Sequence, residues 1–232
     1  KKSKSNSNTF KKQITNNQKF NNKSYLDFNS TISIGKTDTD QRELSNATFF
    51  DNSRDNTNRN VNSKNIAKTD SYLFDLKYTL PVTDSIKVAV GTSYNFIDNE
   101  TNNTALDYND ITGEFDNINT DLSRLFETKL NTINPYAQFL LNKSKLSATV
   151  RVGANIYNQD NFGNYKDVDY SNSQQKTLPD LQGNIRYQKG NNSVMLMYNY
   201  STSLASSSQV LPIEDQSNLT STTVGNPDLD PN

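Results

Sequence analysis

Apolar and polar side chains alternate with a period of two residues in nearly every apolar stretch of this chain. Between residues 70 and 80 the even positions carry Tyr72, Phe74, Leu76, Tyr78 and Leu80, and the odd positions are polar apart from Leu73. The stretch 146–157 alternates in the same way. Neighbouring side chains of an extended strand point to opposite faces, whereas a helix repeats about every 3.6 residues. The sequence therefore predicts β-strands that each have one apolar and one polar face.

Short polar segments join these strands in pairs, a pattern typical of β-hairpins. We expect four hairpins within residues 25–201. Their strands lie within 26–50, 70–97, 124–157 and 177–201, and their short connectors are 35–40, 81–85, 142–145 and 189–192. In the first hairpin the returning strand is assigned to residues 43–50.

The connectors between the hairpins are long and polar. They comprise 51–69, 98–123 and 158–176; a basic polar loop at 1–24 and a long polar loop at 202–232 flank the hairpins. Long loops without secondary structure are uncommon in compact soluble domains. Alternating short and long connectors place all short turns at one end of an up-and-down sheet, as in outer-membrane barrels. We therefore expect an all-β, antiparallel up-and-down transmembrane β-barrel, of which about eight strands are seen.

Strand length also favours a membrane. A tilted strand needs about 9–11 residues to cross the hydrocarbon layer, and the runs 70–80, 86–97 and 146–157 have that length. A wet interior explains how a mean hydropathy of −0.85 coexists with clean apolar faces. The lipid-facing side chains are expected to include Phe74, Leu76, Val88, Val90, Val150, Val152 and Leu196. Periodicity alone also allows a soluble antiparallel sheet with one wet face.

Composition excludes several classes of function. The chain has no Cys and no His, which removes thiolate nucleophiles, Ser-His-Asp and Cys-His triads, and the commonest transition-metal ligands. No catalytic, cofactor-binding or metal-ligating residue can be assigned, so we expect a protein that is not an enzyme and uses no cofactor. No apolar run reaches the roughly 18 residues of a membrane helix. A net charge of −1 gives no general basis for nucleic-acid binding.

Two charged segments have alternative interpretations. Residues 98–127 are acidic, and 107–110 with Gly113 and Glu114 suggests a calcium loop, but the spacing is not that of an EF-hand. Calcium binding there is left open beside a plain solvated loop. Residues 1–24 contain lysines without acids, with Phe10 and Phe20 between them. Solvation, or contact with anionic lipid headgroups, accounts for this segment better than nucleic acid does.

A series of short motifs occupies the C-terminal part of the chain. The segments 177–181, 185–187, 194–200 and 209–212 are followed by Gly225, Asn226, Pro227, Asp228, Leu229, Asp230 and Pro231. With the hairpin that begins at residue 70, this series resembles the C-terminal barrel region of TonB-dependent-receptor-like outer-membrane proteins. Its most specific part is a family-like turn motif formed by Gly225, Asn226, Pro227, Asp228, Leu229 and Pro231.

The resemblance implies a receptor in the outer membrane of a Gram-negative cell that imports a nutrient or metal chelate by an energy-coupled mechanism. It further implies a barrel of about 22 strands around a plug. The partners would be outer-membrane lipid, the plug domain and remaining barrel strands, a TonB-type energy-coupling protein contacted through the missing part, and a small ligand of unknown identity. On this basis the chain is expected to be a segment of a larger barrel.

Two alternatives remain open at this point. The first is a small self-contained outer-membrane barrel with a structural or adhesive role, since about eight strands can close on themselves. The second is a soluble glycan-binding β-sandwich. A sandwich would bury its apolar faces against a second layer of protein, which distinguishes it from both barrels.

Overall fold

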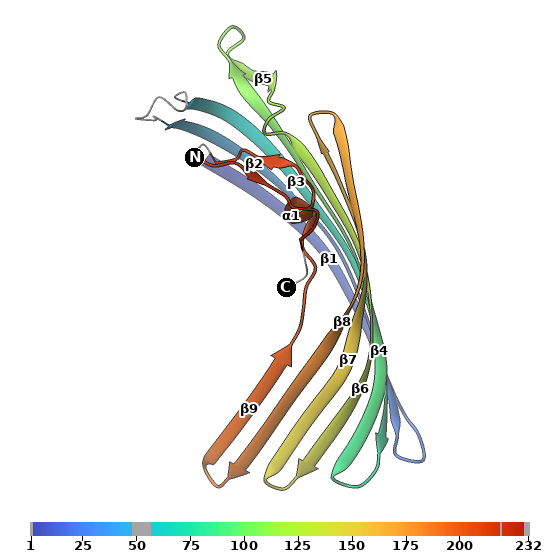
Figure 1. Ribbon diagram of the computed structural model, residues 1–232. Helices are drawn as coiled ribbons and strands as arrows, with labels where there is room; N and C mark the ends of the chain where they lie inside the picture. The colour runs from blue at the N-terminus through green and yellow to red at the C-terminus, as the bar shows by residue number, and fades with distance from the viewer. Residues whose placement is uncertain (1, 48–56, 219, 230–232) are drawn as a thin grey trace.

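Long β-strands make up most of the molecule. The structure, a computed structural model, describes residues 2–47, 57–218 and 220–229. The long strands are β1 (Lys2–Lys19), β2 (Tyr25–Ala47), β3 (Thr57–Pro81), β4 (Ile86–Asn109), β6 (Arg124–Lys143), β7 (Leu146–Tyr165) and β8 (Val168–Lys189), and the shorter elements are β5 (Glu114–Ile118), β9 (Asn192–Tyr200), α1 (Ser207–Val210), β10 (Glu214–Asp215) and β11 (Thr223–Val224) (Figure 1). Among the residues described, no helix has the length and apolar character to cross a membrane.

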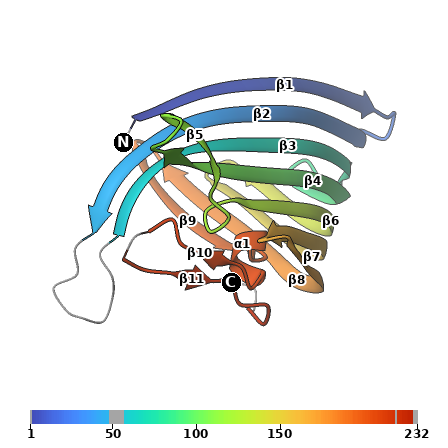
Figure 2. The same cartoon turned by 90° about the horizontal axis from the view of Figure 1, so that it is seen from above.

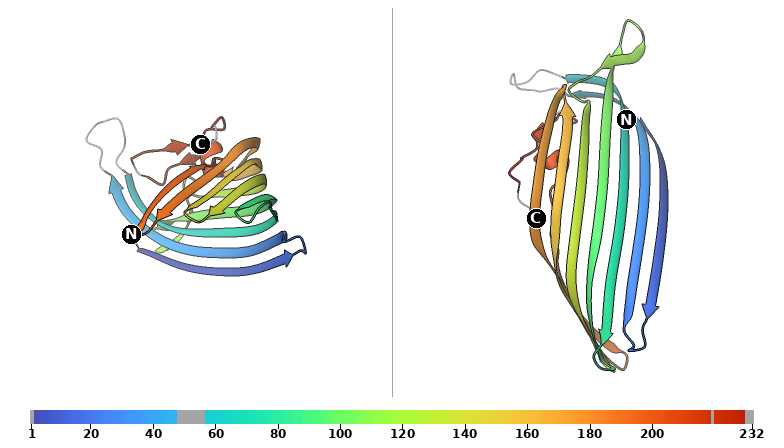
Figure 3. Two further views of the ribbon diagram at one scale, coloured as in Figure 1. Left: turned by 90° about the horizontal axis from the view of Figure 1, so that it is seen from below. Right: turned by 90° about the vertical axis from the view of Figure 1, so that its right-hand side faces the viewer.

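The strands form one strongly curved antiparallel sheet. Its order is β1-β2-β3-β4-β6-β7-β8-β9, and β5 pairs with β4 beside this path. In the described part of the chain, β1 pairs with β2 alone and β9 with β8 alone, so the sheet is open at both edges. Figures 2 and 3 show a trough whose concave side holds α1, β10 and β11. The predicted all-β, up-and-down architecture is confirmed.

One end of the sheet, which we call the turn end, carries short connections. They span residues 20–24, 82–85, 144–145 and 190–191 between successive strands. Ser144 and Gly190 have positive φ angles of 39° and 58°, as two-residue hairpin turns require. Three of the four predicted short connectors, 81–85, 142–145 and 189–192, are thus confirmed.

The prediction for the first hairpin is wrong. Residues 35–40 lie inside β2, and the strand joined to β2 by a short turn is β1. The predicted basic loop at 1–24 is therefore mostly strand. Both faces of β1 are rich in polar residues, so the apolar signal of a strand is lost although the hydrogen-bonded ladder continues. Residues 48–50 of the expected return strand lie outside the described residues.

The predicted long connectors are also largely strand. β3 begins at Thr57, β4 extends to Asn109, and β7 and β8 are joined by Lys166 and Asp167 alone. Both of these turn residues have positive φ, at 52° and 61°. The link between β4 and β6 remains long and contains β5. The strands thus continue far beyond their apolar stretches toward the second end of the sheet, which we call the far end.

The register places the apolar side chains on the convex face. One row of paired neighbours runs across six strands and consists of Leu26, Tyr78, Val90, Ala137, Val152 and Leu181. Within the described ranges no second sheet covers this face, because the two-stranded β10–β11 sheet lies on the concave side (Figure 1). A β-sandwich would need such a layer, and the residues that the structure describes do not form one.

The apolar stretch shifts steadily along the strands. From the row just described it extends toward the far end on β2, as far as Ile34, and toward the turn end on β8, as far as Tyr187. An apolar band staggers in this way along the ladder when the strands tilt relative to the band, as the strands of barrels do.

The convex face changes character beyond the apolar stretch. Asp70, Asp98, Lys129 and Asp160 form one continuous row across β3, β4, β6 and β7. In the next row toward the far end, Lys68 Nζ lies 3.0 Å from Glu100 Oε1. This charged row bounds the apolar band of the convex face on the side of the far end.

Candidate functional site

The chain after β9 folds back onto the concave face near the far end. We call the described residues 201–218 and 220–229 the C-terminal segment. Its Val210, Leu211 and Ile213 form a buried cluster with Tyr165 of β7, and Phe126 of β6 packs against this cluster. Burial of such side chains is worth about 1.5–3 kcal/mol each. The concave side therefore carries a folded element fixed by a small hydrophobic core.

Two glycines let the C-terminal segment approach closely. A Cβ atom at Gly163 would lie 2.6 Å from Ile213 Cδ1 and 2.8 Å from Leu211 Cδ1. Within the segment, a Cβ atom at Gly225 would overlap the carbonyl of Leu211, and the Asn226 amide donates to the Gln209 carbonyl at 2.6 Å. The absence of a side chain at both positions is thus a requirement of this packing.

Polar contacts tie the segment to strands on both sides. Arg124 of β6 forms an ion pair with Asp215 at 2.6 Å. Arg59 of β3 donates to the carbonyls of Gln216 and Ser217, each at 2.9 Å. On β7, the Tyr157 hydroxyl donates to the Thr202 carbonyl at 2.9 Å. The segment consequently spans the concave face from β7 to β3.

The environment of Asp215 favours its ionised form. Partial burial alone would raise the pKa of this carboxyl group, but hydrogen bonds from Arg124 and from Ser217, with the positive charge of Arg124, outweigh burial and lower it below the ordinary 3.8. The Ser217 amide donates to Asp215 Oδ1 at 2.9 Å. The ion pair therefore persists at neutral pH.

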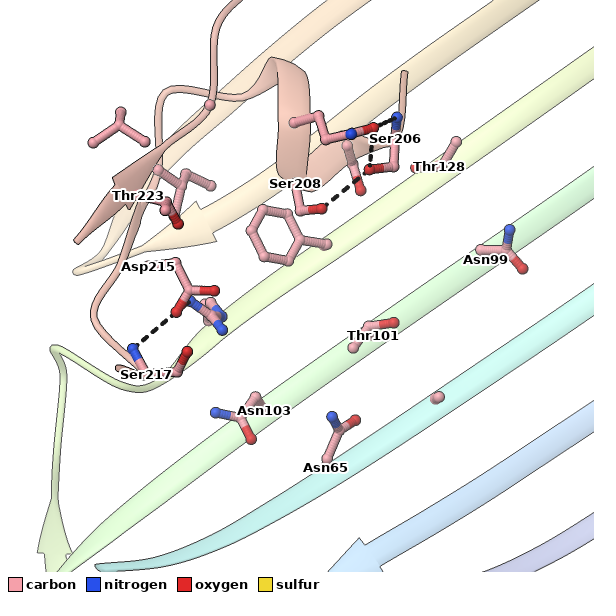
Figure 4. A pocket seen from close by; sticks show the side chains of 18 of the residues that line it. Asn65, Asn99, Thr101, Asn103, Thr128, Ser206, Ser208, Asp215, Ser217 and Thr223 are labelled. Atoms are coloured by element: carbon pink, nitrogen blue, oxygen red, sulfur yellow. Dashed lines mark hydrogen bonds and ion pairs between the residues drawn. The ribbon is translucent and has the colours of Figure 1, made fainter. Parts of the chain in front are cut away.

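A cavity of about 1030 Å³ lies between the C-terminal segment and the strand wall. Figure 4 shows Asn65, Asn99, Thr101 and Asn103 on the strands, facing Ser208 and other residues of the segment. In the described lining, two charged side chains face this cavity, Arg124 and Asp215, and they pair with each other; the Lys68 side chain lies on the convex face, paired with Glu100. The described lining thus combines polar side chains with apolar ones such as Phe126 and Ile213, and its two facing charges are paired.

The wall of the cavity has a regular arrangement. Asn65 pairs with Asn103, and Thr69 with Asn99, across β3 and β4, so these side chains stand in rows on one face. Asn65 Oδ1 is buried and has no hydrogen-bond partner among the described residues. An unpaired buried amide oxygen is costly, and a bound ligand could satisfy it.

A second polar group lies on the concave face at the level of the apolar stretch. Asp180 of β8 is buried and accepts from Asn134 Nδ2 at 3.0 Å and from Gln182 Nε2 at 3.2 Å. Arg151 donates to Asn134 Oδ1 at 2.6 Å, and its Nε lies 3.7 Å from the Asp180 carboxylate. We call these four residues the wall network, and it links β6, β7 and β8.

Tyr136 extends the wall network across the sheet. The Arg151 guanidinium lies 3.7 Å from the centre of its ring, and the Tyr136 hydroxyl donates to Asp75 of β3 at 3.4 Å. The ring lies over Gly91, where a Cβ atom would be 2.6 Å from Tyr136 Cζ. A glycine opposite the tyrosine therefore provides the space for this ring on the inner wall.

The residues predicted as sites lie in two separate places. Phe74, Leu76, Val88, Val90, Val150, Val152 and Leu196 share the convex face by register, and all are exposed there. The turn motif lies on the concave side instead: the Asp228 amide donates to Asn226 Oδ1 at 3.0 Å, and Leu229 packs against the buried cluster. Pro231 lies outside the described residues.

The acidic stretch 98–127 does not converge on one point. Its first part belongs to β4 and a later part to the β4–β5 hairpin. Among the described residues, no three His, Cys, Asp or Glu side chains are grouped so that they could hold a metal ion.

Sequence reasoning missed the cavity and the wall network. The signal that could have revealed the cavity is the alternation that continues beyond the apolar stretch, with Asn99, Thr101 and Asn103 at every second position. Arg151 and Asp180 gave no local signal, because their contact joins residues on different strands. The contact follows only from the strand register.

The curved sheet, its uncovered apolar face and its polar interior define a transmembrane β-barrel wall. Comparison with protein-family models agrees: the model of the outer membrane protein beta-barrel family matches residues 4–232. The chain belongs to this family and is located in the cell outer membrane. A search of curated proteins finds no match.

Proposed function

We propose that this chain is part of a large outer-membrane barrel that serves as a receptor and transporter for energy-coupled uptake of a nutrient or metal chelate. The observation that carries the proposal is the C-terminal segment docked on the concave face. An eight-stranded barrel has an interior just wide enough for its own side chains. A folded segment with a helical turn, a small sheet and a cavity of about 1030 Å³ beneath it needs a wider barrel.

The open edges support the same proposal. In lipid, the backbone N–H and C=O groups of an edge strand have no water with which to bond, so barrels in membranes are closed. β1 is 18 residues long, and its second edge has no partner among the described residues. These open edges support the proposal that further strands complete the wall and that a plug domain and a TonB-type energy-coupling protein act with them.

The convex face is proposed to contact lipid. Its exposed side chains include Val90 and Val152, both 54% accessible, which in water would form an extended apolar patch of a kind that soluble monomers rarely expose. In the membrane the same side chains meet acyl chains, while the polar concave face meets the aqueous interior.

The proposal is tested by uptake in cells. Cells with and without the complete protein are given labelled oligosaccharides, peptides and ferric chelates, in the presence and absence of a protonophore. We expect uptake of at least one compound to require both the protein and the proton-motive force. Uptake that persists in the protonophore would indicate a passive pore, and would contradict energy coupling.

A further inference from the structure

We infer that the cavity beneath the C-terminal segment binds a neutral, hydroxyl-rich ligand, of which an oligosaccharide is the chemical class. This inference rests on the proposed function, from which it takes the assumption that the cavity receives an imported compound. It names the class of that compound from the side chains that surround the cavity.

The first observation concerns the charged side chains that face the cavity. The two charged side chains that face the cavity in its described lining neutralise each other: Asp215 accepts from Arg124 at 2.6 Å, and Lys68 holds its side chain on the convex face against Glu100. A multiply charged ligand such as a phosphate or an anionic metal chelate would have to break this ion pair or enter without a counter-charge. Either event is costly in a partly buried site, so the lining favours a neutral ligand.

The second observation is the hydrogen-bonding capacity of the wall. The polar residues on the strand side carry amides or hydroxyls, in the rows of Asn65 and Asn103 and of Thr69 and Asn99. These groups both donate and accept, and a sugar hydroxyl does so too. The unpaired Oδ1 of Asn65 is one acceptor that a ligand hydroxyl would satisfy.

The third observation concerns shape and apolar surface. The cavity volume of about 1030 Å³ lies at the upper end of the range for small-ligand sites, which suits several sugar units. Phe126 is the one aromatic residue of the described lining, and it offers an apolar surface to the C–H face of a sugar ring. A peptide would need separate apolar pockets for its side chains; the rows of amides and hydroxyls on the strand side provide none, and the apolar lining residues Ile213, Val224 and Leu229 belong to the C-terminal segment.

Binding measurements on the complete protein in detergent test this inference. The probes are neutral gluco-, xylo- and manno-oligosaccharides, sulfated oligosaccharides, mixed peptides and a ferric hydroxamate. The test variant carries Asn65→Ala and Asn99→Ala. The matched control carries Asn62→Ala and Asn102→Ala, whose side chains lie on the same two strands but on the convex face. Heat-modifiable migration checks that both variants are folded.

We expect a neutral oligosaccharide to bind, with affinity about tenfold lower in the test variant and unchanged in the control. Binding of only charged probes or peptides, or of no probe at all, overturns the inference. An equal loss in both variants also overturns it, because the site would then lie elsewhere. If the expected binding is found but uptake does not need the proton-motive force, the inference stands and the proposed energy-coupled function fails.

Discussion

Thr149 and Val150 are neighbours in β7 whose side chains lie on opposite faces of the sheet. Val150→Arg places a charge on the convex face among Phe139 and other apolar side chains. We expect it to destabilise the folded protein in lipid vesicles, reducing the free energy of unfolding by about 2–4 kcal/mol, which is the cost of arginine near the membrane midplane. Urea titration in lipid vesicles measures this change.

Thr149→Arg is the matched control, since its side chain lies on the wet concave face. Its effect should be much smaller than that of Val150→Arg. Equal destabilisation by the two substitutions would contradict the account, because it would mean that lipid does not contact the convex face while water contacts the concave face.

Gly163 tests the docking of the C-terminal segment. Gly163→Val would place a side chain where Ile213 and Leu211 already lie within 3 Å of the Cβ position. We expect over-packing to weaken docking by about 1–3 kcal/mol and to speed cleavage after Glu214 by the protease Glu-C, measured by mass spectrometry. Gly183→Ala is the control, because a Cβ atom there meets nothing within 4 Å. Unchanged cleavage in Gly163→Val would show that the segment does not pack on β7.

At the scale of elements, the ion pair between β6 and β10 predicts a response to pH. The pKa of Asp215 is lowered when the segment is docked. The ion pair therefore stabilises docking fully at pH values above the ordinary pKa of 3.8, and this stabilisation is lost as the pH falls through the lowered pKa. The distribution of distances between spin labels at positions 64 and 218, measured by pulsed EPR, should broaden as the pH falls below about 4, because the segment is then held less firmly. Asp215→Asn should remove this response, and a pH response that survives the substitution would contradict the assignment.

The wall network joins three strands through one buried carboxylate. Asp180→Ala leaves the Arg151 guanidinium without its carboxylate partner, and we expect a loss of about 3 kcal/mol in unfolding free energy. Replacing both residues with apolar ones should cost less than the single change, which a double-mutant cycle by urea titration detects. Strictly additive effects would mean that the pair is not coupled.

The sequence predicted those elements whose faces differ in polarity. Apolar alternation located β3, β4, β7 and β9 and their short turns, because one face of each meets an apolar medium. It failed for β1 and for the far half of β2, where Thr37–Asp40 has polar side chains on both faces. There the strand is held by backbone pairing with its neighbours, which side-chain periodicity does not report.

At the scale of the whole molecule, the sheet has an apolar convex face and a polar concave face. The class and the membrane location could be read from the sequence, whereas the candidate site could not. The cavity depends on the return of the C-terminal segment to the concave face, and Leu211 reaches Gly163 across 48 positions of sequence. Short apolar groups in a polar segment, such as Val210 and Leu211, give no period from which this docking could be predicted.

The most direct test of this account is a nitroxide scan along β7 in the outer membrane. The chain has no Cys, so single cysteines introduced from 147 to 154 can be labelled one at a time, and accessibility to oxygen and to a nickel chelate measured at each. We predict a period of two, with oxygen favoured at 148, 150, 152 and 154 and nickel at the positions between them. Even positions shielded from both reagents would show that protein, and not lipid, covers the convex face.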